Sequence, residues 1–162
     1  MSDATPANAG TAPTVRVILI VAGHKENGEP SFEELLVRDL TGGRYHVVAA
    51  PGLASGIAAE DVIAYDEGER TFEVVERGGN LCVQLYGPHE VTKALVTEVN
   101  RLGGTFDGAT ELNSVYSIPV TATFPVVEKL FRDYVAAYPG TNWYFGNAYD
   151  PVDDETPLNW WL

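Results

Sequence analysis

The sequence predicts an α+β protein, in which a small N-terminal β-barrel-like meander is followed by a ferredoxin-like β-α-β-β-α-β half. Residues 15–86 contain short β-favouring runs separated by glycine-rich or acidic turns, a pattern typical of small barrels. Two later segments place apolar residues at helical spacing. After Gly79 the expected order is strand, helix, strand, strand, helix, strand, which is the order of a ferredoxin-like unit.

This pattern divides the chain of 162 residues into four parts. Residues 1–13 are rich in alanine, threonine and proline and are expected to form a disordered leader, because they have little to bury. Residues 14–80 form the β-rich half and residues 81–149 the ferredoxin-like half. Residues 150–162 form an acidic, tryptophan-rich tail.

In the β-rich half, residues 15–22 are a continuous β-favouring run, as expected for a central strand. Residues 33–40 and 44–50 flank Thr41-Gly42-Gly43, which favours a hairpin. Residues 33–40 alone also fit a short helix. Two further strands are expected at residues 60–65 and 71–76.

In the second half, strands are expected at residues 81–86, 105–109, 113–120 and 142–147. The first helix is expected at residues 89–102. Thr123 is expected to cap the second helix, with Pro125 in its first turn. Right-handed crossovers then place both helices on one face of a four-stranded sheet. Strands 105–109 and 142–147 would form its edges.

Several segments resemble the bacterial domain-of-unknown-function family numbered 4265. These segments are residues 45–65, 72–85, 102–108 and 117–120. The resemblance extends over about residues 15–138, and its motifs are glycine-rich turns and hydrophobic strands. It implies a fold and no particular activity, since the family offers no catalytic residues to transfer.

The charge of the chain favours a basic partner. Asp and Glu number 23 against 10 Lys and Arg, for a net charge of -13, and neither Lys nor Arg occurs after Arg132. Nucleic acids and anionic membranes are bound through basic side chains, so we expect neither as a partner. Solubility alone would also account for the acidity.

The sequence also indicates a cytoplasmic location. Cys82 is the only cysteine, so no intramolecular disulfide can form. The N-terminus lacks the basic start and apolar core of a signal peptide. The longest apolar run, residues 17–22, is too short to span a bilayer.

No set of residues in the sequence predicts catalysis, a metal site or a cofactor. Cys82 lies in a predicted strand, where a free cysteine is expected to be buried as a small hydrophobic residue. His24, His46 and His89 are too widely spaced for a metal-binding motif. An enzyme would require His46, Cys82 or Asp61 to converge in space.

The remaining acidic and glycine motifs are read as structural. Glu60 and Asp61 are adjacent at the start of a predicted strand and would point to opposite faces, so we expect them to close a loop. Asp107 is expected in a turn. The glycine pairs at residues 42–43, 78–79 and 103–104 match no phosphate-binding motif.

The C-terminal region combines aromatic and acidic residues. We expect a partner-binding surface from Trp143, Tyr144, Tyr149, Asp150, Asp153, Asp154, Glu155, Trp160 and Trp161. Aromatic side chains would anchor a basic partner, and carboxylates would steer it. The alternative is that the two final tryptophans fold back to cover a sheet edge or face.

Two functional hypotheses follow. The first is a non-catalytic, acidic protein-binding protein, in its sharpest form an immunity or antitoxin-type inhibitor that covers a basic site on a toxin or enzyme. The second is a regulatory domain that binds a small molecule between the two halves, at the loop of residues 51–59.

Overall fold

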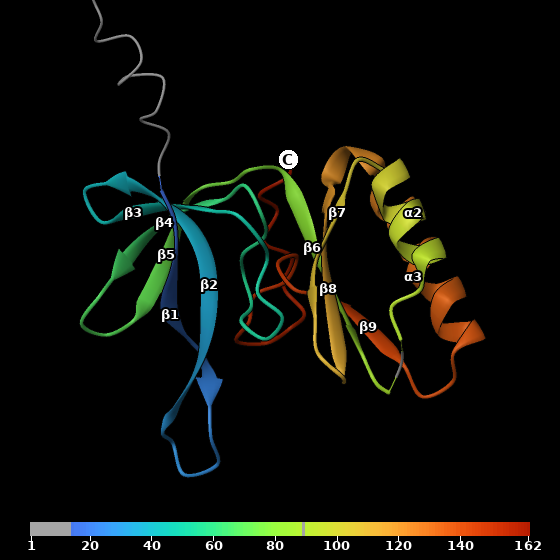
Figure 1. Cartoon of the computed structure of the whole chain (residues 1–162), viewed down its shortest axis with the longest axis horizontal. Helices are drawn as coiled ribbons and strands as arrows, with labels where there is room; N and C mark the ends of the chain where they lie inside the picture. Colours follow the sequence, from blue (N-terminus) through green and yellow to red (C-terminus); the bar gives the residue numbers. More distant parts are fainter. Residues whose placement is uncertain (1–13, 89) are drawn as a thin grey trace, which may run out of the picture.

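Two antiparallel sheets and two helices make up the protein, as a computed structural model shows for residues 14–88 and 90–162. The sheets lie side by side, and both helices cover the far face of the second sheet (Figure 1). The α+β class is therefore confirmed. The leader expected at residues 1–13 lies outside the described residues, as does His89.

The first sheet is a five-stranded meander with its strands in chain order. Its strands are β1 (Val15–His24), β2 (Pro30–Thr41), β3 (Arg44–Val47), β4 (Val62–Asp66) and β5 (Thr71–Glu76). The hairpin expected around Gly42 and Gly43 joins β2 to β3. The sheet is open, with β1 and β5 at its edges, so the expected meander is confirmed and it does not form a closed barrel.

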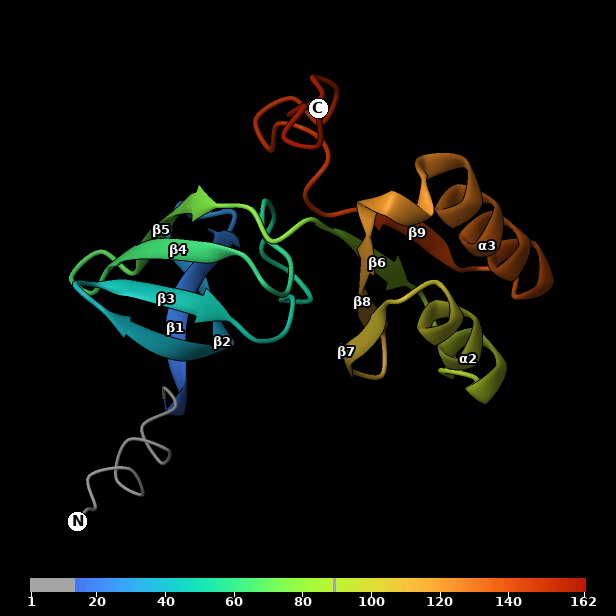
Figure 2. The same cartoon turned by 90° about the horizontal axis from the view of Figure 1, so that it is seen from above.

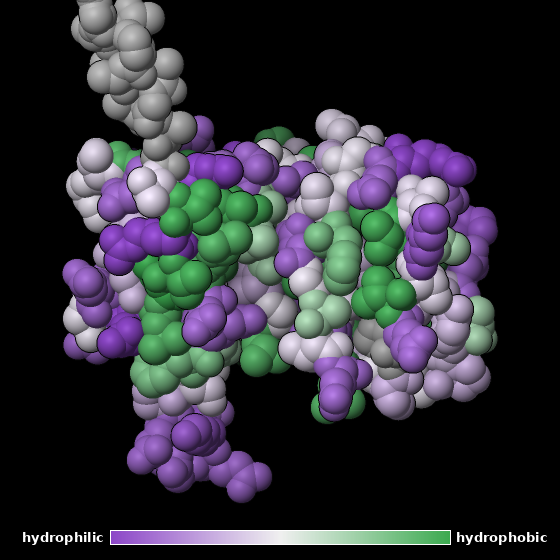
Figure 3. All heavy atoms as spheres, viewed as in Figure 1, coloured by the Kyte–Doolittle hydropathy of each residue, from purple (hydrophilic) through white to green (hydrophobic). Residues whose placement is uncertain are grey.

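The prediction of a central strand at residues 15–22 is wrong, because β1 is an edge strand. Ile18 and Ile20 face the core, but the alternate residues Val15 and Val17 are 44% and 52% exposed. A continuous apolar run can therefore cover both faces of an edge strand. The outward residues contribute to the hydrophobic patch over β1 and β2 in Figure 3.

The segment of residues 33–40 is part of a strand and not a helix, since β2 includes all of it. Leu35 and Val37 are buried, and their neighbours Glu34 and Leu36 are exposed, which is the alternation of a half-buried strand. The core of this half also receives Ile57 from the loop between β3 and β4.

The second sheet has the strand order β7-β8-β6-β9. Its elements are β6 (Asn80–Tyr86), α2 (Lys93–Arg101), β7 (Thr105–Ala109), β8 (Asn113–Pro119), the short 3-10 helix η1 (Val120–Ala122), α3 (Phe124–Ala137) and β9 (Asn142–Phe145). β7 and β9 lie at the edges, and the helices lie together on one face (Figure 2).

The helix termini depart slightly from the predictions. Helix α2 begins at Lys93, later than expected, because the Thr92 side chain caps it by accepting a hydrogen bond from the Leu95 N–H at 3.1 Å. Thr123 stands at the N-cap position of α3, but its side chain makes no capping bond.

Neither helix is long and apolar enough to cross a membrane, nor is any other helix among the described residues.

Alternate residues of strand β6 pack on opposite faces of the second sheet. Leu81, Val83 and Leu85 belong to the core beneath the helices. Cys82 alternates with them and packs in a separate cluster with Ala50, which comes from the loop between β3 and β4. This loop therefore covers the sheet face opposite the helices.

Candidate functional site

The loop between β3 and β4 connects the two halves of the molecule. We call residues 48–61 the inter-sheet loop, since they lie between the two sheets (Figure 1). Side-chain carboxylates from both sides hold its backbone. Three hollows border the loop, and the two that lie beside residues 49–55 are the candidate sites.

Glu33 of β2 holds the first part of this loop. Its carboxylate accepts hydrogen bonds from three consecutive backbone N–H groups, those of Gly52 at 2.7 Å, Leu53 at 3.1 Å and Ala54 at 2.8 Å. Successive N–H groups that converge in this way form an anion-binding concavity. Here the protein's own side chain fills it, which fixes the loop against the first sheet.

Asp107 of β7 holds the loop from the opposite side. Its Oδ2 atom accepts hydrogen bonds from the Ala50 N–H at 2.8 Å and from the Ser117 hydroxyl at 2.6 Å. The Ser117 oxygen in turn accepts a bond from the Ala59 N–H at 3.1 Å. The expectation that Asp107 is a turn residue is wrong: it lies within β7, at a bulge next to Gly108.

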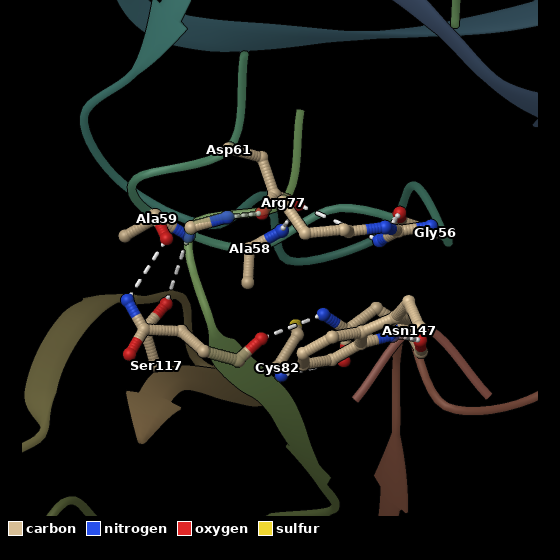
Figure 4. A network of polar contacts seen from close by, with 11 residues as sticks. Gly56, Ala58, Ala59, Asp61, Arg77, Cys82, Ser117 and Asn147 are labelled. Atoms are coloured by element: carbon tan, nitrogen blue, oxygen red, sulfur yellow. Dashed lines mark hydrogen bonds and ion pairs between the residues drawn. The ribbon is translucent and has the colours of Figure 1, made fainter. Parts of the chain in front are cut away.

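Asp61 closes the end of the loop, as expected for one of the two adjacent acids. Its carboxylate accepts from the Ala58 N–H at 3.0 Å and from the Gly78 N–H at 2.8 Å, and lies 3.6 Å from the Arg77 guanidinium (Figure 4). Burial raises the pKa of Asp61 and lowers that of Arg77. Arg77 also donates to the Gly56 carbonyl at 2.8 Å.

Cys82 is structural. Its side chain is fully buried, and burial raises the pKa of its thiol, which disfavours the reactive thiolate. The Cys82 N–H donates to Asn147 Oδ1 at 2.8 Å. Gly146 lies so near that an added Cβ would be 2.8 Å from the sulfur. The residue therefore packs the layer between the second sheet and the loop.

His46, Cys82 and Asp61 form no hydrogen bonds with one another. His46 is paired instead with Glu60 at 2.9 Å, while His24 is exposed at the end of β1. His89 lies outside the described residues. Within the described part of the chain, no three His, Cys, Asp or Glu side chains are grouped as a metal site requires.

The first hollow lies beside β9 and has a volume of about 670 Å³. We call it the aromatic–acidic hollow. It is lined by Leu53, Ser55, Gln84, Tyr86, Glu128, Trp143, Tyr144, Phe145, Gly146, Tyr149 and Asp154. None of these described lining residues is Lys, Arg or His, so a cation entering the hollow meets carboxylates and ring faces without an opposing positive charge in the lining.

The second hollow lies between β2 and the β7–β8 hairpin and has a volume of about 590 Å³. We call it the apolar–acidic hollow. Leu36, Leu53 and Leu112 contribute apolar surface, and Glu34 adds a carboxylate. Tyr86 and Leu53 line both hollows. The two hollows thus lie on either side of the inter-sheet loop, where the sequence predicts a small-molecule site.

The tail folds back onto the body of the protein. Trp160 Nε1 donates to the Asn147 carbonyl at 2.8 Å, and its ring lies 5.4 Å from the Arg77 guanidinium carbon. Trp161 stands edge-on to Phe124, with ring centroids 4.9 Å apart. These two tryptophans therefore pack internally.

The acidic part of the tail forms turns. Asp153 accepts from the Thr156 hydroxyl at 2.6 Å and from the backbone N–H groups of Glu155 and Thr156, and these bonds lower its pKa to about 2. Asp150 accepts from the Val152 N–H at 2.9 Å. Tyr149 and Asp154 reach the aromatic–acidic hollow.

Of the residues expected to bind a partner, four line this hollow: Trp143, Tyr144, Tyr149 and Asp154. Glu128 of α3 and the loop-holding role of Glu33 are not predicted from the sequence. The role of Glu33 could have been predicted from the sequence, because Glu33 alternates with Leu35 and Val37 and so lies on the same, buried face of β2. An acid on the buried face of a strand requires polar partners.

Comparison with known proteins places the chain in a family. The family model described as Domain of unknown function (DUF4265) matches residues 33–138. The chain is also similar to a hypothetical protein from Neisseria gonorrhoeae whose crystal structure is known, with a TM-score of 0.62 and 14% sequence identity. That similarity covers 83% of this chain and 94% of the other. At this identity it shows the fold alone.

No curated protein matches the chain. The family match begins at residue 33 and not near residue 15, and it ends at residue 138 as the resemblance implies. It therefore includes Glu33, Asp107 and the inter-sheet loop but excludes β9 and the tail. Because the matched segment exceeds half of the 162 residues, the chain belongs to the DUF4265 family of unknown function.

Proposed function

We propose that this protein is a non-catalytic, acidic protein that binds a basic protein partner at the aromatic–acidic hollow. One observation carries the proposal: Tyr144, Tyr149 and Trp143 share this hollow with Glu128 and Asp154, and its described lining contains no basic side chain. Rings attract cations through their faces, and carboxylates pair with ammonium and guanidinium groups.

The charge of the whole chain supports the same partner. A net charge of -13 accelerates encounter with a basic protein and disfavours nucleic acids. Asp150, Asp153 and Glu155 add carboxylates to the turn that contains Asp154. Trp160 and Trp161 have a supporting role in this proposal, because their rings pack on the body of the protein.

The sharpest form of the proposal is an immunity or antitoxin-type inhibitor in the cytoplasm that covers a basic site on a toxin or enzyme. An enzyme that handles nucleic acid needs a basic surface, and an acidic protein of complementary shape would compete for it. Inhibition distinguishes this form from simple binding, since an inhibitor lowers the partner's activity when it is added.

The test is co-purification from the native host at low salt with two matched variants. Glu128→Lys/Asp154→Lys reverses the charge of the hollow, and Glu26→Lys/Glu29→Lys makes the same net change at the distant, exposed β1–β2 turn. We expect the wild type and the turn variant to retain a basic partner that the hollow variant loses. A partner retained equally by both variants, or no basic partner, would refute the proposal.

The second candidate function is small-molecule binding in the apolar–acidic hollow. Its supporting observation is that the Gly52 carbonyl accepts hydrogen bonds from Asn113 and Tyr86, each at 3.0 Å, so a fixed loop backbone forms one wall. A ligand of the native state raises the melting temperature. A thermal-shift screen of metabolites in which wild type responds and Leu112→Asp does not would favour this function.

We also infer that the second half is a ferredoxin-like unit. The element order β6-α2-β7-β8-α3-β9 and the strand order β7-β8-β6-β9 support this assignment. In such a unit the last strand forms an edge, which is the position of β9.

A further inference from the structure

We propose that the free edge of β9 pairs with an extended, basic segment of the partner, which would add a strand to the second sheet. This inference rests on the proposed function and specifies how the partner is held. Addition of a strand to an exposed edge is a recurrent mode of peptide recognition, in which backbone hydrogen bonds provide affinity.

The backbone of β9 presents groups to such a strand. The Gly146 N–H donates to the Cys82 carbonyl at 2.8 Å, which marks this pair as a hydrogen-bonded one. Antiparallel ladders alternate, so the N–H and C=O of Tyr144 face β6, and those of Trp143 and Phe145 point away from it. Among the described residues, no group outside the ladder bonds to the backbone of Trp143 or Phe145.

The aromatic–acidic hollow follows this edge. The register places Trp143 and Phe145 on the face of Leu85 and Val83, toward the helices, and Tyr144 on the opposite face. These three of the four residues of β9 line one hollow. A hollow that touches both faces of an edge strand passes along its outer margin, where an added strand would lie.

The carboxylates beside the edge of β9 favour a basic segment as the added strand. Glu128 lies on the helix side of the hollow and Asp154 comes from the tail. Neither is among the ion pairs of the described residues. An extended segment with Lys or Arg at alternate positions would bring its cations to these carboxylates. A second copy of this acidic chain would bring further negative charge and is disfavoured.

The other sheet edges are less suited to pairing. β7 is interrupted by a bulge between Phe106 and Gly108, and β1 by a bulge between Val21 and Gly23. The third edge strand, β5, shifts its register against β4 between Val62 and Ile63. Bulges protect edges from pairing. The Val21 N–H is also already bonded to the Arg70 carbonyl at 2.9 Å. Strand β9 carries neither feature.

The test uses the wild-type protein and a six-residue peptide of alternating Lys and Val. We expect NMR titration to shift the amide protons of Trp143 and Phe145 downfield and to leave that of Tyr144 nearly unchanged. The same peptide with every backbone amide N-methylated keeps its charge but cannot form the ladder. We expect its affinity to fall by at least about tenfold, since several hydrogen bonds are lost.

Three results would overturn edge pairing: no binding of the parent peptide, binding of the methylated peptide within about twofold of the parent, or a shift of Tyr144 as large as those of Trp143 and Phe145. The proposed function is judged separately. If the methylated peptide binds and the Glu128→Lys/Asp154→Lys variant weakens it, the acidic hollow still recognises cations while the edge inference fails.

Discussion

Tyr86 and Tyr144 meet edge to face, with ring centroids 5.8 Å apart and an interplanar angle of 60°. Tyr86 belongs to β6 and donates its hydroxyl to the Gly52 carbonyl of the inter-sheet loop at 3.0 Å, and burial raises its pKa. Tyr144 belongs to β9 and is 56% exposed. The pair therefore connects the fixed loop to the ring that a partner would meet.

Tyr144→Ala should weaken binding of a basic partner or of the Lys-Val peptide by several-fold, because an exposed ring contributes about 0.5–1 kcal/mol to a cation contact. Unfolding free energy should change by less than about 0.5 kcal/mol, as is usual for surface positions. Tyr144→Phe is the matched control and should bind as the wild type does. Equal affinity for all three proteins, measured by calorimetry, would exclude the ring from the site.

Glu33→Gln should destabilise the protein and loosen the inter-sheet loop. An amide keeps one acceptor oxygen where the carboxylate has two, so one of the backbone N–H groups at Gly52, Leu53 and Ala54 loses its partner. The expected cost is about 1–3 kcal/mol, measured by urea denaturation. Amide exchange at residues 52–54 should accelerate.

The neighbouring Glu34→Gln is the control for this experiment. It makes the same charge change at an exposed position and should leave both stability and exchange near the wild-type values. If the two variants were equally stable, the Glu33 contacts would not hold the loop.

Gly146→Ala should destabilise through contact with Cys82. The added methyl would lie 2.8 Å from the sulfur and 3.3 Å from the Gln84 side chain, and overpacking of this kind costs about 1–3 kcal/mol. Cys82→Ala removes the sulfur, so the double variant should lose less stability than the sum of the single variants. Strictly additive losses in denaturant titrations would show that this contact is not the cause.

The pH dependence of stability should reflect Asp61. Burial raises its pKa above the ordinary 3.8, so the native state retains a proton that the unfolded state releases. The contribution of Asp61 is thus fully present below pH 3.8 and is lost as pH rises through the raised pKa. Relative to Asp61→Asn, wild-type unfolding free energy should fall across this window. A relative rise would mean that the Arg77 pair outweighs burial.

Much of the fold can be predicted from local patterns. The hairpin around Gly42 and Gly43 joins β2 to β3 as expected, and Cys82 is buried in a strand as expected for a free cysteine. Local patterns of this kind predict turns and the buried positions within a strand. They do not show which strands are neighbours, and this is why the apolar run of β1 predicts a central strand although β1 lies at an edge.

The residues of the candidate site are harder to predict from local sequence patterns. Asp107 holds Ala50 across 57 positions of sequence, and Glu33 holds residues about 20 positions away. Their roles depend on the packing of the two halves. Tyr144 and Asp154 are among the residues expected from the sequence because aromatic and acidic residues are dense in one short segment. Glu128 has no such local signal, since an acid on a helix is usually only solvated.

The most direct measurement is the affinity of the alternating Lys-Val peptide for three proteins in isothermal titration calorimetry at low salt. These are the wild type, Glu128→Lys/Asp154→Lys and Glu26→Lys/Glu29→Lys. We predict that the first and third bind within about twofold of each other and that the second binds about tenfold more weakly. Equal weakening in both variants would show that only net charge matters, and it would contradict a specific site beside β9.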